Sequence, residues 1–418
     1  MENSYDIIII GGGIIGSSIA YNLANDGFNG NILVIEKDPS YEFASTSLSA
    51  GGVREQFSLP ENIKISRYGL TIFEHFDDTM AVDGESAHAE FKQHGYLFLA
   101  DEKNLSLIKK NYHTQKNLGA SVSLLSPDEI KKLIPHINTE DISGGCFGSR
   151  DGYLDPYSIL QGNIKKGKSL GVEYLYEEVM GIEVKKGKIY GVTTDKGTQL
   201  QCSMIVNAAG PYASMIGKMV GIDLPVEPVR KMVFVFDPKV KFDYNLPLVI
   251  DTDGLLYFRH EMGKTILTGR SLPDEVPGLN FNWDRDFYMN TVWPQIAKRI
   301  PVFDTAKLIR GWAGLYAMNR IDGNAIIGKL GDIEGFFGAV GFSGHGLQQS
   351  PAVGKCVSEL IRLGEYKTID LSCFSFDRFE TGKLVFEDEI VSAYDGLFGS
   401  EISIETSFPG SVPAATKA

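Results

Sequence analysis

The chain has 418 residues, of which 43% are hydrophobic and 22% charged, and its formal net charge is −13 at pH 7. This length suits two or three domain-sized units with a large core, and the composition is ordinary for a globular protein. The acidic balance offers no basic footprint for nucleic acid, and no run of about 18 apolar residues predicts a membrane-spanning helix.

The first predicted element is also the most informative. The apolar run Tyr5–Ile10 predicts a buried parallel strand, and glycines with G-x-G-x-x-G spacing follow it at Gly11, Gly13 and Gly16. Gly11 permits a tight turn, Gly13 lets a pyrophosphate approach the backbone, and Gly16 lets the next helix pack on the strand.

A helix and a second strand complete this unit. The helix begins near Ile14 and Ile15, and its free N–H groups face a diphosphate. The strand 32–35 ends on Glu36, about twenty residues after the glycines, where a carboxylate accepts hydrogen bonds from an adenosine ribose. We predict a dinucleotide site, because a ligand-free glycine turn would not explain Glu36.

Cysteines and histidines carry little signal. Four cysteines and seven histidines are scattered without C-x-x-C or H-x-x-x-H spacing, so we predict reduced thiols and no metal site. Because the dinucleotide unit begins almost at the first residue, we expect no cleavable signal peptide and a cytoplasmic protein.

The next part of the chain alternates helices and strands. Residues 45–54 are small and polar, which suits backbone close to a flat ligand, although a plain loop would also explain them. Helices are predicted near 63–76 and 102–119, from Pro127 onward after a Ser126 cap, and over 156–170. Strands are predicted near 90–100, 172–176, 181–185 with 189–194 as a hairpin, and 204–206. The last strand ends in the small residues 207–211, at the strand end where open α/β sheets bind ligands.

The residue composition changes at the start of the second half. From Val229 to Arg270 the sequence is rich in β-forming residues, which suggests a separate antiparallel layer, completed by a helix near 284–299 and a strand at 308–312. Strands near 325–328 and 335–340 then return to the first domain. A glycine-rich turn, Gly341–Gly346, leads into a helix over 347–363, and the tail from Thr381 has no clear role.

In this order the motifs resemble those of the FAD-dependent amine oxidoreductases of the D-amino-acid oxidase / sarcosine oxidase family, over nearly all of residues 4–380. Four segments carry the resemblance: the N-terminal unit up to Glu36, residues 47–54, residues 206–210 and residues 341–346. Ser49–Phe57 and Gly346–Pro351 are most similar to the FOXRED-like and dimethylglycine/sarcosine dehydrogenase-like branch.

The resemblance implies an α/β fold in which an FAD-binding Rossmann-like domain of the glutathione-reductase type is interleaved with an α+β substrate domain. The antiparallel sheet of the substrate domain would roof the flavin. Residues 1–82, 146–222 and 321–380 would form the FAD-binding domain, 83–145 and 223–320 the substrate domain, and 381–418 a C-terminal tail.

The resemblance also implies which positions contact FAD. Those expected positions are Gly11, Gly13, Ile14, Ile15, Gly16, Glu36, Lys37, Ser45, Thr46, Ser47, Ala50, Gly51, Gly52, Val179, Ala208, Ala209, Gly210, Gly314, Gly341, Phe342, Ser343, Gly344, His345, Gly346, Leu347 and Gln348. A helix that begins after Gly346 would direct its positive end at the flavin ring, where reduced flavin carries negative charge. We expect His345 to act through its backbone, with a catalytic imidazole as the alternative.

Departures from the family pattern are informative. Relatives that tether the flavin use a cysteine where Gly314 stands, or a histidine before Arg54, and this chain has neither, so we predict non-covalent FAD. Oxidases of the family place a lysine above the flavin, and a rough alignment puts Leu267 there with Lys264 nearby. We therefore expect a dehydrogenase that passes electrons to a carrier protein or quinone, with O₂ as the alternative acceptor.

For the substrate, the resemblance implies oxidation of a C–N bond by hydride transfer to flavin N5, with a cationic side chain on a carboxylate. Arg54 and Arg259 are the candidate clamps, because a planar guanidinium suits bidentate binding. Tyr257 would supply a phenol or an aromatic wall, and Gln348 stands where relatives carry a substrate-contacting lysine. Alternatively, Arg54 only contacts the flavin, Arg259 is a surface charge and Tyr257 packs in the core.

Together these inferences predict an FAD-dependent oxidoreductase that acts on a small secondary or tertiary amino acid such as sarcosine, dimethylglycine or a proline-like imino acid. The alternatives are a D-amino-acid or 2-hydroxy-acid dehydrogenase, an oxidase that produces hydrogen peroxide, and a flavoprotein assembly factor for a redox complex. The expected partners are an amino-acid or N-methylated amine substrate and the electron acceptor, and a homo-oligomer is left open.

Overall fold

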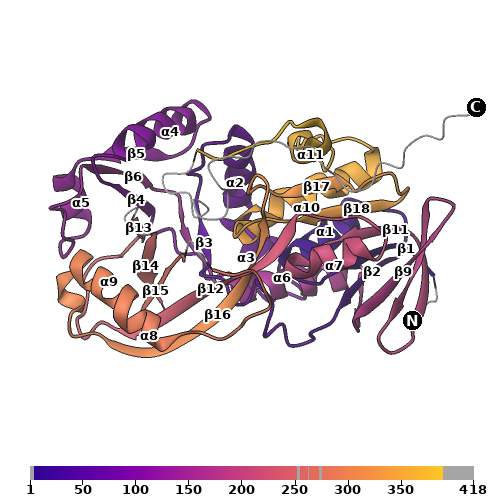
Figure 1. Cartoon of the computed structure of the whole chain (residues 1–418), viewed down its shortest axis with the longest axis horizontal. Coiled ribbons are helices and arrows are strands. Elements are labelled where there is room, and N and C mark those ends of the chain that lie inside the picture. The colour runs from indigo at the N-terminus through magenta and orange to yellow at the C-terminus, as the bar shows by residue number, and fades with distance from the viewer. Residues whose placement is uncertain (1–3, 252–254, 262, 273–274, 389–418) are drawn as a thin grey trace, which may run out of the picture.

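The structure is a computed structural model that describes residues 4–251, 255–261, 263–272 and 275–388. The part of the predicted C-terminal tail that follows residue 388 lies outside the described residues. Two eight-stranded sheets form the molecule, one at the right of Figure 1 and one at the left.

The first sheet holds the N-terminal strand at its centre. Its parallel core has the order β8–β2–β1–β11–β18, with β17 antiparallel at one end and the β9–β10 hairpin attached through β11. Its strands are β1 (Ser4–Ile10), β2 (Ile32–Glu36), β8 (Glu173–Tyr176), β9 (Val179–Lys185), β10 (Lys188–Thr194), β11 (Gln199–Asn207), β17 (Ile326–Lys329) and β18 (Phe336–Val340).

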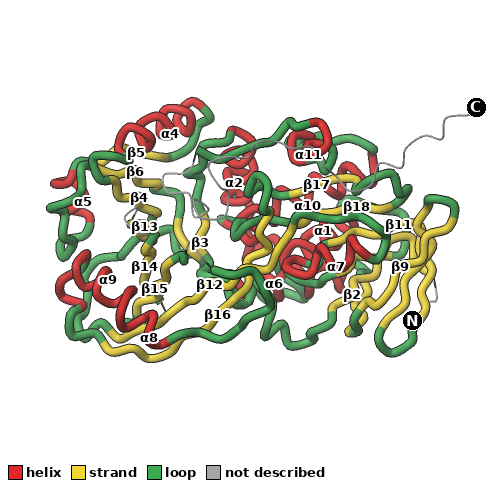
Figure 2. The backbone as a smooth tube through the Cα atoms, viewed as in Figure 1, coloured by secondary structure: helices red, strands yellow, loops and turns green. Residues whose placement is uncertain are grey.

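Both faces of β1 are covered, which is why this strand reads as a continuous apolar run. Ile7 and Ile9 lie in one core and Ile8 and Ile10 in the core on the opposite face. Four helices pack together on the first face, α1 (Ile14–Asn25), α2 (Pro60–Phe73), α6 (Pro156–Ser169) and α10 (Gly346–Leu363). On the second face lies α7 (Ala213–Lys218), which follows the 3₁₀ turn η1 (Gly210–Tyr212); Figure 2 shows these helices around the sheet.

The second sheet is mostly antiparallel, with the order β16–β12–β15–β14–β13–β4–β6–β5. Its strands are β4 (Tyr96–Ala100), β5 (Val122–Leu125), β6 (Gly144–Gly148), β12 (Val226–Asp237), β13 (Leu248–Asp251), β14 (Leu256–His260), β15 (Ile266–Arg270) and β16 (Lys307–Asn319). The long strands β12 and β16 reach the first sheet, because Val226 and Ala317 at their ends pack in its core.

The remaining helical segments are distributed over both sheets: Phe76 and Phe374 pack in a core of the first sheet, whereas Tyr288, Ile296 and Phe303 pack in the core of the second. These segments are α3 (Phe76–Thr79), α4 (Leu105–Asn117), α5 (Pro127–Leu133), α8 (Arg285–Phe287), the π-turn η2 (Tyr288–Val292), α9 (Trp293–Arg299), the 3₁₀ turns η3 (Pro301–Phe303) and η4 (Ser372–Phe374), and α11 (Arg378–Thr381). Ser126 caps α5 through a complete capping box with Glu129, in line with the predicted cap. A small ladder of β3 (Gly52–Val53) and β7 (Gly152–Tyr153) joins the two halves.

Three predicted elements differ in detail. The helix predicted over 284–299 is interrupted by the π-turn just before Pro294, which has no N–H to donate. Of the segment predicted as strand near 90–100, residues 96–100 form β4 and Lys92 makes an isolated bridge with Tyr153, because the positive φ angle of Gly95 interrupts the extended chain just before β4. The predicted domain boundary at residue 146 falls inside β6, which pairs with β4 and β5, and the division into two domains stays a prediction.

Candidate functional site

An elongated cavity lies at the carboxyl ends of β1, β2 and β11, and we call it the dinucleotide cavity. It extends from Glu36 and Lys37 at one end to Gly344 and Leu347 at the other. Seventeen of the predicted FAD contacts line it: Gly11, Gly13, Ile14, Ile15, Glu36, Lys37, Ser45, Thr46, Val179, Ala208, Ala209, Gly210, Phe342, Ser343, Gly344, Gly346 and Leu347.

The glycine turn between β1 and α1 has the geometry that a diphosphate requires. Gly11 has a φ of 103°, and a Cβ there would lie 2.5 Å from the carbonyl oxygen of Ala208. A Cβ at Gly13 would meet only Thr46 Oγ1 at 3.6 Å, and one at Gly210 would meet nothing within 4 Å. Open space therefore adjoins the backbone at Gly13, at the N-terminus of α1 where an anion is stabilised, and at Gly210, at the start of η1.

The outer end of the cavity is formed by Glu36 and Lys37. The Glu36 carboxylate accepts hydrogen bonds from Gly12 N at 2.7 Å and Asp38 N at 2.9 Å, while burial raises its pKa. Two acceptor sites remain on this carboxylate for hydroxyl donors. Lys37 Nζ lies 3.3 Å from the ring centroid of Tyr212, so a cation–π contact borders this end. These features suit an adenine dinucleotide, and the positions of its ribose at Glu36 and its diphosphate at Gly13 stay predictions.

Five predicted FAD contacts line neither this cavity nor the one described next. A Cβ at Gly16 would lie 1.9 Å from Gly11 O and one at Gly51 2.3 Å from Leu154 O, so these glycines permit close backbone packing. Gly314 packs on Leu48, Gly341 lies beside Val226 and Asn319, and the Ser47 hydroxyl is buried without a hydrogen-bond partner. The remaining four, Ala50, Gly52, His345 and Gln348, line the second cavity instead.

The second cavity, which we call the substrate cavity, encloses about 230 Å³ between the β18–α10 turn and the second sheet. It shares Ser49, Tyr316, Ser343, Gly344 and Leu347 with the dinucleotide cavity, so the two cavities adjoin at these residues. A group bound along the first cavity can therefore present one end to a small molecule in the second.

Arg54 is the cationic side chain of the substrate cavity. Its guanidinium stacks 3.9 Å from the Phe57 ring, with Tyr96 and Phe98 at 5.9 and 5.5 Å. Gln348 Oε1 accepts from Arg54 N at 2.9 Å, and Arg54 Nη1 donates to Gln56 O at 2.9 Å. Among the described residues, no carboxylate lies within ion-pair distance of this guanidinium.

His345 lies beside Arg54 and is neutral. Burial, together with the Arg54 charge, lowers the pKa of His345 to about 3. Arg54 Nη2 is 3.3 Å from His345 Nε2, and because a guanidinium only donates, Nε2 accepts and the proton is on Nδ1. The His345 ring also packs edge-on against Phe57 at 5.1 Å. This imidazole orients Arg54 and is poorly suited to act as a base.

Tyr257 and Arg259, two residues apart on β14, have different surroundings. Tyr257 lines the substrate cavity, and burial raises its pKa well above the usual range, so the phenol keeps its proton. Arg259 is buried outside the cavity, where Nε donates to Ala50 O at 2.8 Å and Nη1 pairs with Glu261 at 2.6 Å. The structure thus places Arg259 neither at the predicted carboxylate site nor on the surface, and it contacts the site only through Ala50.

Several residues of the substrate cavity were missed by the sequence analysis. They are Gln56, Phe57, Ser58, Tyr96, Phe98, Ile108, Asn111, Gln115, Cys146, Leu248, Ile250, Leu255, Ser271, Tyr316, Glu387 and Asp388. Tyr96 and Phe98 alternate on β4, and Ile108, Asn111 and Gln115 share one face of α4, so periodicity could have found these five. The acidic pair, Glu387 and Asp388, comes from a distant segment and left no local signal.

The structure shows the surroundings of Leu267 and of two lysines near the position where oxidases of the family carry a lysine. Leu267 is 1% exposed and packs with Val233, Val235 and Tyr257, while Lys264 lies in the turn between β14 and β15. Lys231, which sequence analysis did not single out, places Nζ 5.6 Å from the Tyr316 ring centroid and 3.3 Å from Ser271 Oγ.

Within the described ranges, no helix is long and apolar enough to span a membrane, and no three metal-ligating side chains gather.

Comparison with protein families gives a match to the description "DAO: FAD dependent oxidoreductase" over residues 6–360. The chain is 36% identical to the FAD-dependent oxidoreductase domain-containing protein 1 of Xenopus laevis, over 92% of this chain and 85% of that protein. It is 28% identical to the mitochondrial dimethylglycine dehydrogenase of Rattus norvegicus, over 86% of this chain and 43% of that protein. The crystal structure of L-proline dehydrogenase from P. horikoshii is similar with a TM-score of 0.84 and 29% identity, covering 92% of this chain and 100% of that one.

Proposed function

The chain belongs to the DAO family of FAD-dependent oxidoreductases, and from this premise we propose that it oxidises the C–N bond of a small secondary or tertiary amino acid, such as sarcosine, dimethylglycine or a proline-like imino acid. The observation that carries the proposal is Arg54. This guanidinium has no carboxylate partner among the described residues and lies in an aromatic cavity that adjoins the dinucleotide cavity. The dehydrogenase names of two similar proteins, for dimethylglycine and L-proline, support the substrate class.

Five residues of the substrate cavity have distinct roles in this proposal. Bound FAD supplies the redox chemistry by accepting a hydride from the carbon next to nitrogen. Arg54 binds and orients the substrate carboxylate, and the rings of Phe57 and Tyr96 exclude water around that ion pair. Neutral His345 holds Arg54 through Nε2, and Tyr257 offers a protonated phenol as a hydrogen-bond donor.

The test is anaerobic mixing of the FAD-loaded protein with a panel of N-methylated, cyclic, primary L- and D-amino acids and 2-hydroxy acids. Loss of the flavin absorbance with N-methyl or cyclic amino acids is the expected result. Reduction only by primary D-amino acids or by 2-hydroxy acids would replace the proposed substrate class. A folded, FAD-loaded protein that no compound reduces would overturn the proposal.

A substitution at Arg54 tests the carboxylate clamp. In Arg54→Lys the charge remains but the planar fork and the stack on Phe57 are lost, so we expect KM for the best substrate to rise about 10- to 100-fold. Arg299→Lys is the matched control, because Arg299 is also buried but pairs with Asp251 and Asp141 outside the cavity. An Arg54→Lys enzyme with unchanged KM would contradict the role.

The proposal includes electron transfer to a carrier protein or quinone, and a cytoplasmic location. Apolar Leu267 in place of a lysine supports a dehydrogenase. The alternative is an oxidase, favoured by the proximity of Lys231 to Tyr316. Stopped-flow reoxidation of the reduced enzyme in air, with hydrogen peroxide detection, separates them: slow reoxidation without peroxide is the dehydrogenase result. Cell fractionation tests the location.

A further inference from the structure

Two buried carboxyl groups lie directly behind the Arg54 turn. Glu55 and Asp151 are both fully buried. Asp151 Oδ1 accepts from Glu55 N at 3.0 Å, and Asp151 Oδ2 accepts from Gln56 Nε2 at 3.0 Å. Asp151 is thus hydrogen-bonded to the two residues that follow Arg54.

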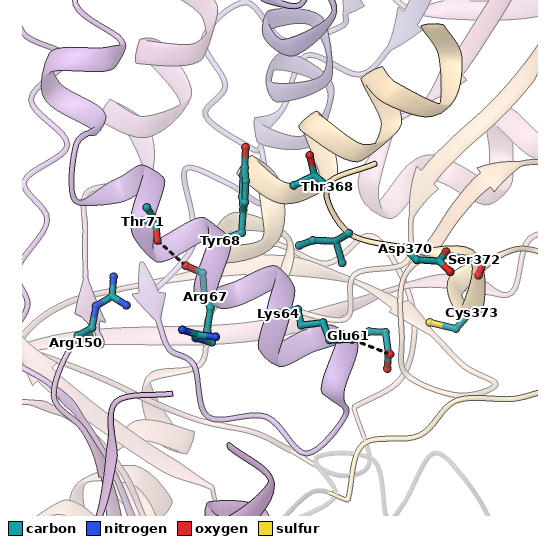
Figure 3. A pocket seen from close by; sticks show the side chains of 11 residues that line it. Glu61, Lys64, Arg67, Tyr68, Thr71, Arg150, Thr368, Asp370, Ser372 and Cys373 are labelled. Carbon is teal, nitrogen blue, oxygen red and sulfur yellow. Dashed lines mark hydrogen bonds and ion pairs between the residues drawn. The ribbon is translucent and has the colours of Figure 1, made fainter. Parts of the chain in front are cut away.

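Glu55 is compensated from the opposite side. Glu55 Oε1 lies 3.3 Å from Arg67 Nε and 3.7 Å from Arg150 Nη1, and Oε2 accepts from Ser121 N at 2.8 Å. Arg67, on α2, and Arg150, before β7, line an open groove, as Figure 3 shows. The charge of Glu55 is therefore balanced by groove arginines, whereas Asp151 has no cation within ion-pair distance among the described residues.

We propose that Asp151 is a positioning residue that holds the Arg54–Gln56 turn against the substrate cavity and sets how tightly Arg54 binds the carboxylate of the substrate. The proposal rests on the proposed function, in which Arg54 is the clamp. The connection is short: Asp151 fixes Gln56, whose carbonyl oxygen accepts from Arg54 Nη1 at 2.9 Å and whose Nε2 also donates to Tyr96 O at 2.9 Å. Arg54 is thereby anchored on one side by Gln56 and on the other by Gln348 and His345.

Because Asp151 can ionise, the binding of a carboxylate at Arg54 should depend on pH. The charged and titratable groups that interact electrostatically with Asp151 are Glu55, Arg54, Arg150, Tyr96 and Cys146. Burial, with the Glu55 charge, raises the pKa of Asp151 to about 7. As the pH rises through this value Asp151 becomes an anion beside Arg54, and a second carboxylate in the cavity is repelled. His345 remains neutral throughout this range, since its pKa is about 3.

The experiment is a titration of the FAD-loaded protein with acetate at pH 5.5 to 8.5, followed by the change in flavin absorbance, so that no turnover is needed. We expect acetate to bind about tenfold more weakly at pH 8.5 than at pH 5.5. In Asp151→Asn, which removes the charge and leaves one acceptor oxygen in place of two, this dependence disappears. In Glu55→Gln the midpoint moves to lower pH, because the Glu55 charge that raises the pKa of Asp151 is removed.

The control is Asp251→Asn. Asp251 is a buried aspartate paired with Arg299 away from the Arg54 turn, so its loss should lower stability and leave the pH dependence intact. A flat profile in the unaltered protein, or an Asp151→Asn variant that keeps the dependence, overturns the proposal. If Asp151→Asn does not fold, the unaltered profile and the Glu55→Gln midpoint decide. Acetate binding with this profile, but no flavin reduction by any amino acid, would overturn the proposed function and leave this inference standing.

Discussion

His345 and Asp151, two buried side chains near Arg54, hold protons differently in the folded and unfolded chain. Burial lowers the pKa of His345 from 6.5 to about 3 and raises that of Asp151 from 3.8 to about 7. Between about pH 4 and 6.5, unfolded His345 is protonated and folded His345 is neutral, so this residue makes the free energy of unfolding fall as the pH falls. Folded Asp151 is protonated and unfolded Asp151 is ionised, so this residue makes the same free energy fall as the pH rises.

We predict that these two effects oppose each other in the unaltered protein and separate in single variants. In Asp151→Asn the free energy of unfolding should decrease from pH 6.5 to 4.5 by up to about 1.4 kcal/mol per pH unit. In His345→Asn it should instead decrease as the pH rises over the same range. Urea unfolding of the FAD-saturated proteins at three pH values measures both slopes, and slopes of the same sign would contradict the assignment.

Arg54 and Arg259 show what a sequence can say about single residues. Both stand in suitable segments, and both were candidate carboxylate clamps. The two arginines differ in their partners: the nearby Glu261 and the distant Ala50 carbonyl occupy the Arg259 guanidinium, whereas His345 and Gln348, both distant in sequence, hold Arg54 open to the cavity. Residue type and spacing predict the chemistry that a side chain offers, while tertiary contacts decide whether that chemistry is free to act.

At the level of elements, the turn before α10 joins the two cavities. Gly344 has a φ of 94°, and a Cβ there would lie 2.3 Å from the Tyr316 ring. Gly364, at the other end of the same helix, has a φ of 77° and nothing within 4 Å. The two glycines share a left-handed backbone conformation, but only Gly344 lacks room for a side chain.

We predict that Gly344→Ala displaces Tyr316 and weakens FAD binding about tenfold or more, since the two share the wall between the cavities. Gly364→Ala should cost about 1 kcal/mol of stability from backbone strain and leave FAD affinity unchanged. Equilibrium dialysis with FAD measures both variants. Equal loss of affinity in the two would show that strain alone, rather than the clash with Tyr316, is responsible.

The N-terminus of α2 is stabilised by a residue from the far end of the described chain. Its N-cap, Leu59, makes no side-chain cap hydrogen bond. Instead the Glu387 carboxylate accepts from Ser58 N at 2.7 Å, Ser58 Oγ at 2.6 Å and Leu59 N at 3.0 Å. Asp388 in turn pairs with Lys110 on α4, so this short segment joins α2 to α4 across the substrate cavity.

We predict that Glu387→Ala lowers the free energy of unfolding by about 1–2 kcal/mol, because a carboxylate at a helix N-terminus and its hydrogen bonds are lost. The control is Glu380→Ala, an exposed residue of α11, for which a change within about 0.5 kcal/mol is expected. Urea unfolding gives both values. If the two variants are equally stable, Glu387 does not stabilise α2.

Local elements were the most predictable part of the fold. Strand β1, its glycines and helix α1 follow from a short-range pattern, as does the Ser126 cap of α5. The Glu387 contact with α2 could not be predicted, because Leu59 carries no capping side chain and nothing near Glu387 points to a helix N-terminus. The aromatic wall of the substrate cavity left a signal in the alternation of Tyr96 and Phe98 on β4, but this pattern does not say which cavity the two rings line.

On the scale of the whole molecule, the cofactor should be held by shape and hydrogen bonds alone. We predict that denaturation in guanidinium or acid followed by ultrafiltration releases all flavin into the filtrate. Position 314 is a glycine, and Cys146, which lines the substrate cavity, has its pKa raised to about 12 by burial and stays a thiol. Yellow colour that remains with the protein after this treatment would show a covalent bond.

The order in which the sheet is built has a consequence during synthesis. Strand β1 leaves the ribosome first, but its neighbour β11 begins at Gln199, and the last wall of the dinucleotide cavity, at Leu347, comes later still. At ordinary elongation rates roughly 20–70 s separate the first wall from the last. Through that interval the apolar edge of β1 has only β2 beside it and is a natural target for chaperones. FAD capture therefore marks the end of nascent-chain folding, and a shortage of the vitamin precursor should show first as loss of newly made protein.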